Sequence, residues 1–215
     1  MRRKAHLADL ERIYVKQLLK LRYDVMLAKG CRISREREMK MTFVGVNLLN
    51  SWSNFIRTYY LSCVFGSKTK STMLVRPSHV FVDLNSAIGY AITLFSPRAI
   101  ANTAGIWHRR NEPPWHDLNT LLRLATSLNF QNLSNINNAM SLNVRVFSDL
   151  PVIRNFYAHR NQGTEEAAKR INLQYGVPSN QLTTDFLFSN PINRPQPVIL
   201  EWLDELQISA DYLCD

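Results

Sequence analysis

Residues 5–29 read AHLADLERIYVKQLLKLRYDVMLAK, and this stretch decides the class of fold. Large apolar side chains recur in it at steps of three and four residues, at Leu7, Leu10, Tyr14, Leu18, Leu21 and Val25. That spacing marks one face of an α-helix, and Gly30 follows as a typical helix end. A strand would alternate at every second residue, so the stretch predicts a long amphipathic helix.

Helical spacing and capping residues recur along the rest of the chain. Asp83 and Asp117 are placed to cap helices, Pro97 can stand in a first turn, and Thr164 can cap a helix that follows Gly163. The helices expected after the first cover about 41–65, 84–95, 97–107, 117–128, 133–147, 151–162, 164–176 and 198–213.

The segments between these helices are polar or rich in proline. Residues 32–40 are expected as a charged first turn or loop, 67–78 as a connection, and 177–197, with four prolines, as an irregular loop. No alternating strand pattern of useful length and no repeat is present. The predicted fold class is therefore all-α, a helical bundle that forms a single domain over residues 1–215.

The charge balance favours an anionic partner. The 26 lysines and arginines exceed the 17 acids, giving a net charge of +9, and eighteen of the cations are arginines. The planar guanidinium group suits bidentate recognition of phosphate. Nucleic acid is the first expectation and a membrane surface the second, while solubility alone is the alternative.

The cysteines give no sign of a metal site or a disulfide framework. Cys31, Cys63 and Cys214 are odd in number, far apart and without C-x-x-C spacing, so they are expected as reduced thiols. The basic start of the chain lacks an apolar signal-peptide core, and its most apolar stretches contain polar residues at intervals. We therefore expect a cytoplasmic protein with no metal and no cofactor.

The segment Arg154-Asn155-Phe156-Tyr157-Ala158-His159 carries the clearest chemistry. It places an arginine, an amide and a histidine within about one and a half turns of the helix expected to begin near Pro151. Asn155 and His159, four residues apart, share a face, and the long side chain of Arg154 can reach the same side. Histidine can move protons near neutral pH and arginine can neutralise a phosphoryl oxygen, so the set could cleave RNA without metal.

A second copy of the pattern shows that helical context decides its value. Arg110-Asn111 followed by His116 has almost the same spacing, but Pro113 and Pro114 break that segment. Its side chains cannot share a helical face. The copy at residues 154–159 is therefore the candidate catalytic set: Arg154, Asn155 and His159.

The segment Arg154-Asn155-Phe156-Tyr157-Ala158-His159-Arg160 resembles the R-N-x-x-A-H-R form of the R-x(4–6)-H signature of the HEPN superfamily, helical nucleotide-binding proteins and ribonucleases. The close match covers about seven residues, and a similarity of helical pattern extends over much of the chain. The resemblance implies a HEPN-like bundle, a homodimer that pairs two copies of the motif helix, and cleavage that leaves a 2′,3′-cyclic phosphate and a 5′-hydroxyl.

One position departs from part of that family. Toxins of the family that are silenced by AMP transfer carry a tyrosine two residues after the histidine, whereas this chain has Asn161 there. The resemblance therefore does not imply control by tyrosine AMPylation.

Several other residues are candidates for contact with RNA. Asn54 and Arg57 lie on a polar stripe of the second helix, which could equally be a solvated or inter-helix face. An aromatic and cationic run could stack on and clamp RNA, or could be a surface loop anchored by its tryptophan. The candidates are Arg160, Arg57, Asn54, Trp107, Arg109 and Arg110.

Three functions remain open at this point. The first is a metal-independent endoribonuclease, a bacterial toxin or anti-phage defence effector that binds RNA as a homodimer, with an antitoxin or defence-system protein as a further candidate partner. The second is a non-catalytic module that binds nucleotide, RNA or a partner protein within a larger system. The third is a purely structural bundle whose Arg154 and His159 form surface ion pairs.

Overall fold

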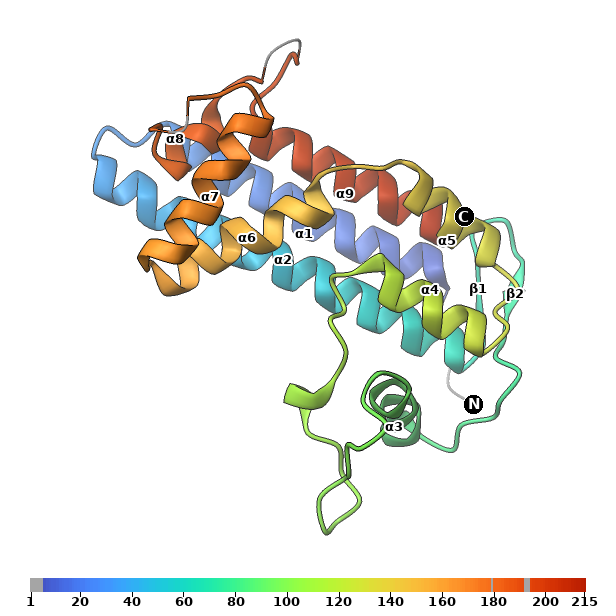
Figure 1. The fold of residues 1–215 in the computed structure, drawn as a ribbon. Helices are drawn as coiled ribbons and strands as arrows, with labels where there is room; N and C mark the ends of the chain where they lie inside the picture. The colour runs from blue at the N-terminus through green and yellow to red at the C-terminus, as the bar shows by residue number, and fades with distance from the viewer. Residues whose placement is uncertain (1–5, 179, 192–193) are drawn as a thin grey trace. The chain divides into compact units, whose positions relative to one another are not determined.

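The protein is described by a computed structural model that covers residues 6–178, 180–191 and 194–215 (Figure 1). These residues form nine α-helices, a 3-10 turn at Arg109–Asn111 and one antiparallel pair of two-residue strands. The expected all-α class is confirmed. None of the described helices is both long enough and apolar enough to cross a membrane.

The chain groups into two compact units. The first unit takes the described residues up to Ile13, then Trp52–Leu142 and Ser209–Asp215; the second takes Tyr14–Ser51 and Asn143–Ile208. Three long helices contribute residues to both units: α1 (Leu7–Lys29), α2 (Ser34–Val64) and α9 (Val198–Cys214).

The first unit is built around the aromatic C-terminal half of α2. It adds α3 (Leu84–Phe95), α4 (Leu118–Ser127) and α5 (Leu133–Ser141), and strands β1 (Ser67–Lys68) and β2 (Leu74–Val75), which pair Ser67 with Val75. Tyr59 and Tyr60 are fully buried, and their hydroxyls donate to the carbonyls of Leu213 (2.9 Å) and Ala87 (2.9 Å). The buried phenols thus satisfy their polar ends and tie α2 to α9 and α3.

The second unit carries the candidate motif. It contains residues 14–29 of α1, 34–51 of α2 and 198–208 of α9, together with α6 (Val146–His159), α7 (Gln162–Gln174) and α8 (Thr183–Phe188). Trp202 and Phe186 are fully buried here. An ion pair between Arg22 and Asp204 links α1 to α9.

The caps predicted at Asp83 and Asp117 are confirmed. Asp83 accepts from Ser86 N (2.7 Å), and Ser86 Oγ accepts in return from Asp83 N (3.1 Å), which is a capping box. Asp117 accepts from Asn119 N (2.9 Å).

The helix expected over 97–107 is wrong. Asn102 folds this segment into turns, because its side-chain oxygen accepts from the backbone N–H groups of Ala104 (3.0 Å) and Ile106 (2.8 Å). A short amide side chain that bonds its own backbone competes with the helix in this way. Gly105 then adopts φ +72°, a conformation that helices exclude.

Three other boundaries also differ from expectation. The charged segment 32–40 is helical from Ser34, where Lys40 and Glu36 pair at 2.9 Å across one turn. The asparagine-rich helix stops at Ser141, and Asn143 takes φ 47°. The proline-rich stretch 177–197 contains α8, whose Phe186 and Leu187 are fully buried; apolar packing thus orders part of a segment expected to be irregular.

The three thiols differ in their surroundings. Cys63 and Cys214 are buried, and burial raises the pKa of both thiols, whereas Cys31 is half-buried. All three are free.

These surroundings predict selective modification. Ellman's reagent at mildly alkaline pH should react quickly with Cys31 and with the other two thiols only after unfolding, because the thiolate is the reactive form and must be reached. Absorbance of the released thiolate measures the equivalents. A Cys31→Ser protein should lose the fast phase, and a second fast equivalent in the folded protein would contradict the buried placement.

Candidate functional site

The motif helix α6 begins earlier than predicted. It starts at Val146, so Pro151 lies inside it, and the start expected near Pro151 is wrong. The cap comes from another helix: Glu205 of α9 accepts from Val146 N (3.2 Å). Asp149, in the first turn of α6, is buried. A carboxylate distant in sequence therefore sets the start of α6.

The end of α6 also differs from the predicted 162. Arg160 follows the last helical residue with φ 44° and ψ 43°, a left-handed conformation that ends the helix. Helix α7 begins at Gln162, capped by Asn161, whose side chain accepts from Thr164 N (2.9 Å). The cap expected at Thr164 is thus wrong: Thr164 is the reciprocal partner of Asn161 in a capping box.

Two of the three candidate catalytic residues are in contact. Arg154 Nη1 donates to Asn155 Oδ1 at 3.3 Å. Arg154 is half-buried and its Nε has no hydrogen-bond partner among the described residues, while Asn155 is exposed. The amide oxygen therefore contacts one end of the guanidinium group, whereas the buried Nε is not open to an external anion.

His159 lies in the last turn of α6 and is exposed. It makes no hydrogen bond or ion pair with any residue in the described part of the chain. No contact joins it to Arg154 or Asn155, although it lies four residues after Asn155 on the same helix. Its imidazole is accessible to an external ligand, but no neighbour in this chain orients it.

Arg160 is held by its own subunit. Its guanidinium donates to Glu38 (2.6 Å) and Thr42 (2.8 Å) of α2 and lies over the rings of Phe156 and Tyr157. These contacts fix the turn between α6 and α7. Arg160 was predicted to contact RNA. Glu38 offsets its positive charge, so Arg160 would have to break this ion pair to present its full charge to a phosphate.

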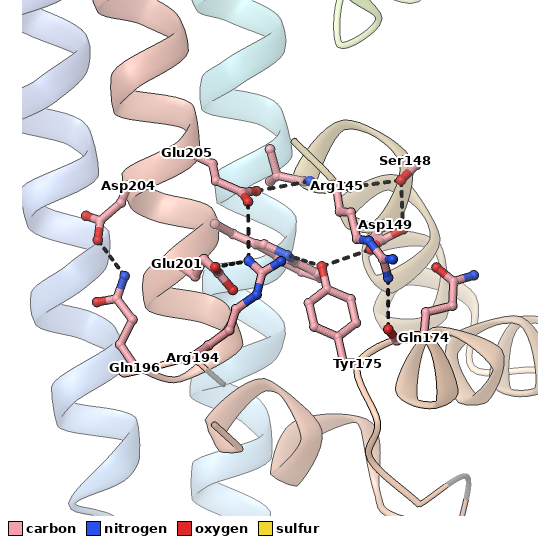
Figure 2. A network of polar contacts seen from close by, with 12 residues as sticks. Arg145, Ser148, Asp149, Gln174, Tyr175, Arg194, Gln196, Glu201, Asp204 and Glu205 are labelled. Atoms are coloured by element: carbon pink, nitrogen blue, oxygen red, sulfur yellow. Dashed lines mark hydrogen bonds and ion pairs between the residues drawn. The ribbon is translucent and has the colours of Figure 1, made fainter. Parts of the chain in front are cut away.

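A buried chain of hydrogen bonds holds the N-terminal half of α6 (Figure 2). Tyr175, just after α7, donates from its hydroxyl to Asp149 (2.9 Å) and accepts from Trp202 Nε1 of α9 (2.9 Å). Ser148 also donates to Asp149 (2.8 Å). The three helices are thus joined through one phenol, and burial raises the pKa of that phenol.

Charged side chains lie next to these buried hydrogen bonds. Arg145 Nη1 donates to Gln174 O (2.9 Å) and its guanidinium lies 5.5 Å from the centre of the Tyr175 ring. Arg194 pairs with Glu201 and lies 4.0 Å from Glu205. Burial raises the pKa of Glu205, although its bond to Val146 N acts in the opposite direction.

A pocket of about 250 Å³ opens beside these arginines. It is lined by Arg145, Gln174, Tyr175, Gly176, Pro191 and Arg194. Both arginines already have partners, and carboxylates of α9 face Arg194. Arg194 is therefore paired with acids of α9, whereas Arg145 contacts a backbone carbonyl and a ring at the end of α7.

Three of the residues predicted to contact RNA lie close together in the first unit. Arg57 makes a two-point ion pair with Glu112 (2.6 and 3.0 Å), whose side chain is only 8% exposed and also accepts from Trp115 Nε1 (2.7 Å). Arg109 donates to Asn54 (3.3 Å). Arg57 therefore neutralises a buried carboxylate, whereas Asn54 and Arg109 lie at the surface.

Trp107 and Arg110 behave differently from each other. Trp107 is half-buried and packs against Gly89 of α3, where an added Cβ would lie 2.2 Å from the indole Nε1. Arg110 is exposed in the 3-10 turn. The tryptophan thus anchors a surface segment.

The structure divides the predicted residues between the two units. Arg154, Asn155, His159 and Arg160 belong to the second unit, and Arg57, Asn54, Trp107, Arg109 and Arg110 to the first. Sequence reasoning missed Glu205 and Tyr175, which hold α6. Tyr175 precedes Gly176 at a helix end, a position at which a buried aromatic gives no signal of its own.

No group of three or more His, Cys, Asp or Glu side chains that could hold a metal ion is found within residues 6–178, 180–191 and 194–215. Comparison of the chain with protein-family models, curated proteins and solved structures gives no match. The resemblance to the HEPN superfamily therefore depends on the motif residues themselves.

The buried chain at Tyr175 gives a first mutational prediction. Tyr175→Phe removes the hydroxyl and leaves Trp202 Nε1 and one oxygen of Asp149 without it, so the free energy of unfolding should fall by about 1–3 kcal/mol. Urea unfolding followed by tryptophan fluorescence measures the change. Tyr23→Phe, at a tyrosine that is 63% exposed, should have little effect. Equal stability of Tyr175→Phe and the wild type would show that the buried hydrogen bonds of Tyr175 do not stabilise the fold.

A second prediction separates structural and RNA-binding roles of Arg57. Arg57→Ala leaves the buried Glu112 carboxylate without its cation and should reduce the free energy of unfolding by about 1–3 kcal/mol. Adding Glu112→Gln should restore part of that loss, since a neutral amide needs no cation, and thermal unfolding measures both proteins. No loss in Arg57→Ala would show that the pair contributes nothing to folding.

Proposed function

We propose that this protein is a metal-independent endoribonuclease of the HEPN type, acting as a bacterial toxin or defence effector. One observation carries the proposal. On a single helix of a basic chain, a guanidinium group is oriented by an amide, and an accessible imidazole follows on the same face. This set can bind a phosphodiester and move its protons.

The chemistry follows from the three side chains. An imidazole takes the proton of a ribose 2′-hydroxyl, the 2′-oxygen attacks the adjacent phosphorus, and the bond to the 5′-oxygen breaks. A protonated imidazole gives that leaving oxygen its proton. Arg154 stabilises the charge on the phosphoryl oxygens, and Asn155 holds Arg154 in place. The products are a 2′,3′-cyclic phosphate and a 5′-hydroxyl, with no external water consumed in this step.

A second copy of the chain completes the proposed site. One imidazole cannot act as base and acid at opposite ends of one phosphodiester in the same step, whereas two copies of α6 around a two-fold axis provide two. The exposure of Asn155 and His159 is compatible with such pairing. In this proposal the homodimer is the active species, and loss of the dimer costs as much activity as loss of His159.

A specific observation favours the alternative of a non-catalytic binding module. Within the described part of the chain no group orients His159, whereas catalytic histidines are usually fixed by a neighbouring acceptor. Arg154 and Asn155 would then hold a phosphate group without cleaving it.

The chain offers a matched pair of histidines for the test. His159→Ala should reduce the cleavage rate of purified protein on RNA by about 100-fold or more, while His116→Ala, at the histidine of the broken second pattern, should retain activity. Cleavage should persist in EDTA, and RNA with 2′-deoxyribose at the scissile position should resist. Analysis of RNA ends by mass spectrometry should find cyclic phosphate.

Three results distinguish the hypotheses. Full activity of His159→Ala would exclude the proposed mechanism. Retarded RNA migration without products over hours, lost in Arg154→Ala, would establish the binding module. Absence of both cleavage and binding would leave a structural bundle.

A further inference from the structure

An exposed apolar surface lies on the helical hairpin formed by α1 and α2 in the second unit, away from the candidate motif in sequence. Seven large apolar side chains between residues 19 and 43 are each at least 43% exposed. We call this surface the hairpin face; it comprises Leu19, Tyr23, Met26, Leu27, Ile33, Met39 and Phe43. Exposed large apolar side chains grouped on neighbouring segments in this way are typical of interaction sites.

The hairpin face contains a pocket. A cavity of about 230 Å³ lies between the two helices, with Leu27 from α1 and Met39 and Phe43 from α2 in its wall. Asp24 and Lys40 complete the lining. The cavity has room for one large apolar side chain, and such pockets between paired helices receive the anchor residues of a bound helix.

Cations surround this apolar surface. Residues 16–43 contain eight lysines and arginines but only three acids. Glu36 and Glu38 are engaged by Lys40 and Arg160. Five exposed cations have no ion-pair partner among the described residues: Lys16, Lys20, Lys29, Arg32 and Arg35. The segment that carries the exposed apolar side chains therefore also carries an excess of unpaired positive charge.

We infer that the hairpin face docks an amphipathic helix of a partner protein whose polar side is acidic. An apolar side chain of the partner enters the pocket at Leu27 and Phe43, and its carboxylates face the unpaired cations. Asp24 in the pocket wall disfavours a carboxylate there, so the acids lie along the flanks of the partner helix.

Other occupants fit less well. A second copy that met this face about a two-fold axis would set its unpaired cations against each other. RNA would satisfy the cations, but only Tyr23 and Phe43 of the seven apolar side chains offer rings on which bases can stack. An anionic membrane remains as an outcome of the test. The inference does not depend on the proposed nuclease activity, because it uses neither Arg154 nor His159.

A displayed library of helical peptides, selected on the full-length protein and counter-selected on its Phe43→Glu variant, tests the inference. Enriched peptides should carry apolar residues at i, i+3, i+4 and i+7 and an excess of Asp and Glu. Absence of enrichment over the variant, or enrichment of peptides without acids, would overturn it.

Fluorescence anisotropy with one selected peptide then locates the site. Phe43→Glu and Leu27→Glu should each raise the dissociation constant by about tenfold or more, and Leu173→Glu, at an exposed leucine of α7, should leave it unchanged. Lys20→Glu should lower the affinity for the acidic peptide but raise the affinity for a version of the peptide with Lys in place of Glu. Circular dichroism confirms that each variant is folded.

Two further measurements address the rival occupants. Vesicles of phosphatidylserine and phosphatidylcholine should not sediment the wild-type protein more than Phe43→Glu; a difference would assign the face to membranes. RNA at physiological salt should not displace the bound peptide, and displacement would assign the face to RNA. Either result would overturn the inference whether or not the protein cleaves RNA.

Discussion

The hydroxyl of Tyr175 links two helices of the second unit through buried hydrogen bonds. It lies among buried side chains and joins Asp149 of α6 to Trp202 of α9. A buried carboxylate and a buried indole N–H both require partners, and a single phenol supplies them by donating to one and accepting from the other. This arrangement ties the first turn of α6, the helix that carries the candidate catalytic side chains, to α9.

Polar partners from other segments also hold both ends of α6. At its start, Glu205 provides a cap from α9, and its charge is offset by Arg194 in the preceding loop. At its end, Arg160 takes a left-handed conformation and is held against Glu38 and Thr42. Helix α6 is thus held at its start by a carboxylate cap and just after its end by an ion pair, whereas Asn155 and His159 remain exposed.

Arginine serves two purposes in this chain. Arg57, Arg145, Arg160 and Arg194 each contact carboxylates or carbonyl oxygens of their own unit. By contrast, Arg154 donates only to the side-chain amide of its neighbour Asn155 among the described residues. The exposed cations Lys16, Lys20, Lys29, Arg32 and Arg35 have no ion-pair partner in the described residues. Net charge alone therefore overstates the surface that is open to an anionic ligand, because part of it neutralises internal acids.

The sequence by itself determined the helical class, most helix positions and the caps at Asp83 and Asp117, because these follow from local spacing and from side chains that bond their own backbone. It also brought Arg154, Asn155 and His159 onto one helix. Only the tertiary structure decided that α6 starts before Pro151, that Asp149 is buried and that Glu205 caps that start. It alone decided, too, that Arg57 and Arg160 are paired within the chain. These outcomes depend on which distant side chains share a buried environment, and the free energy of burying a charge is set by partners that local sequence does not specify.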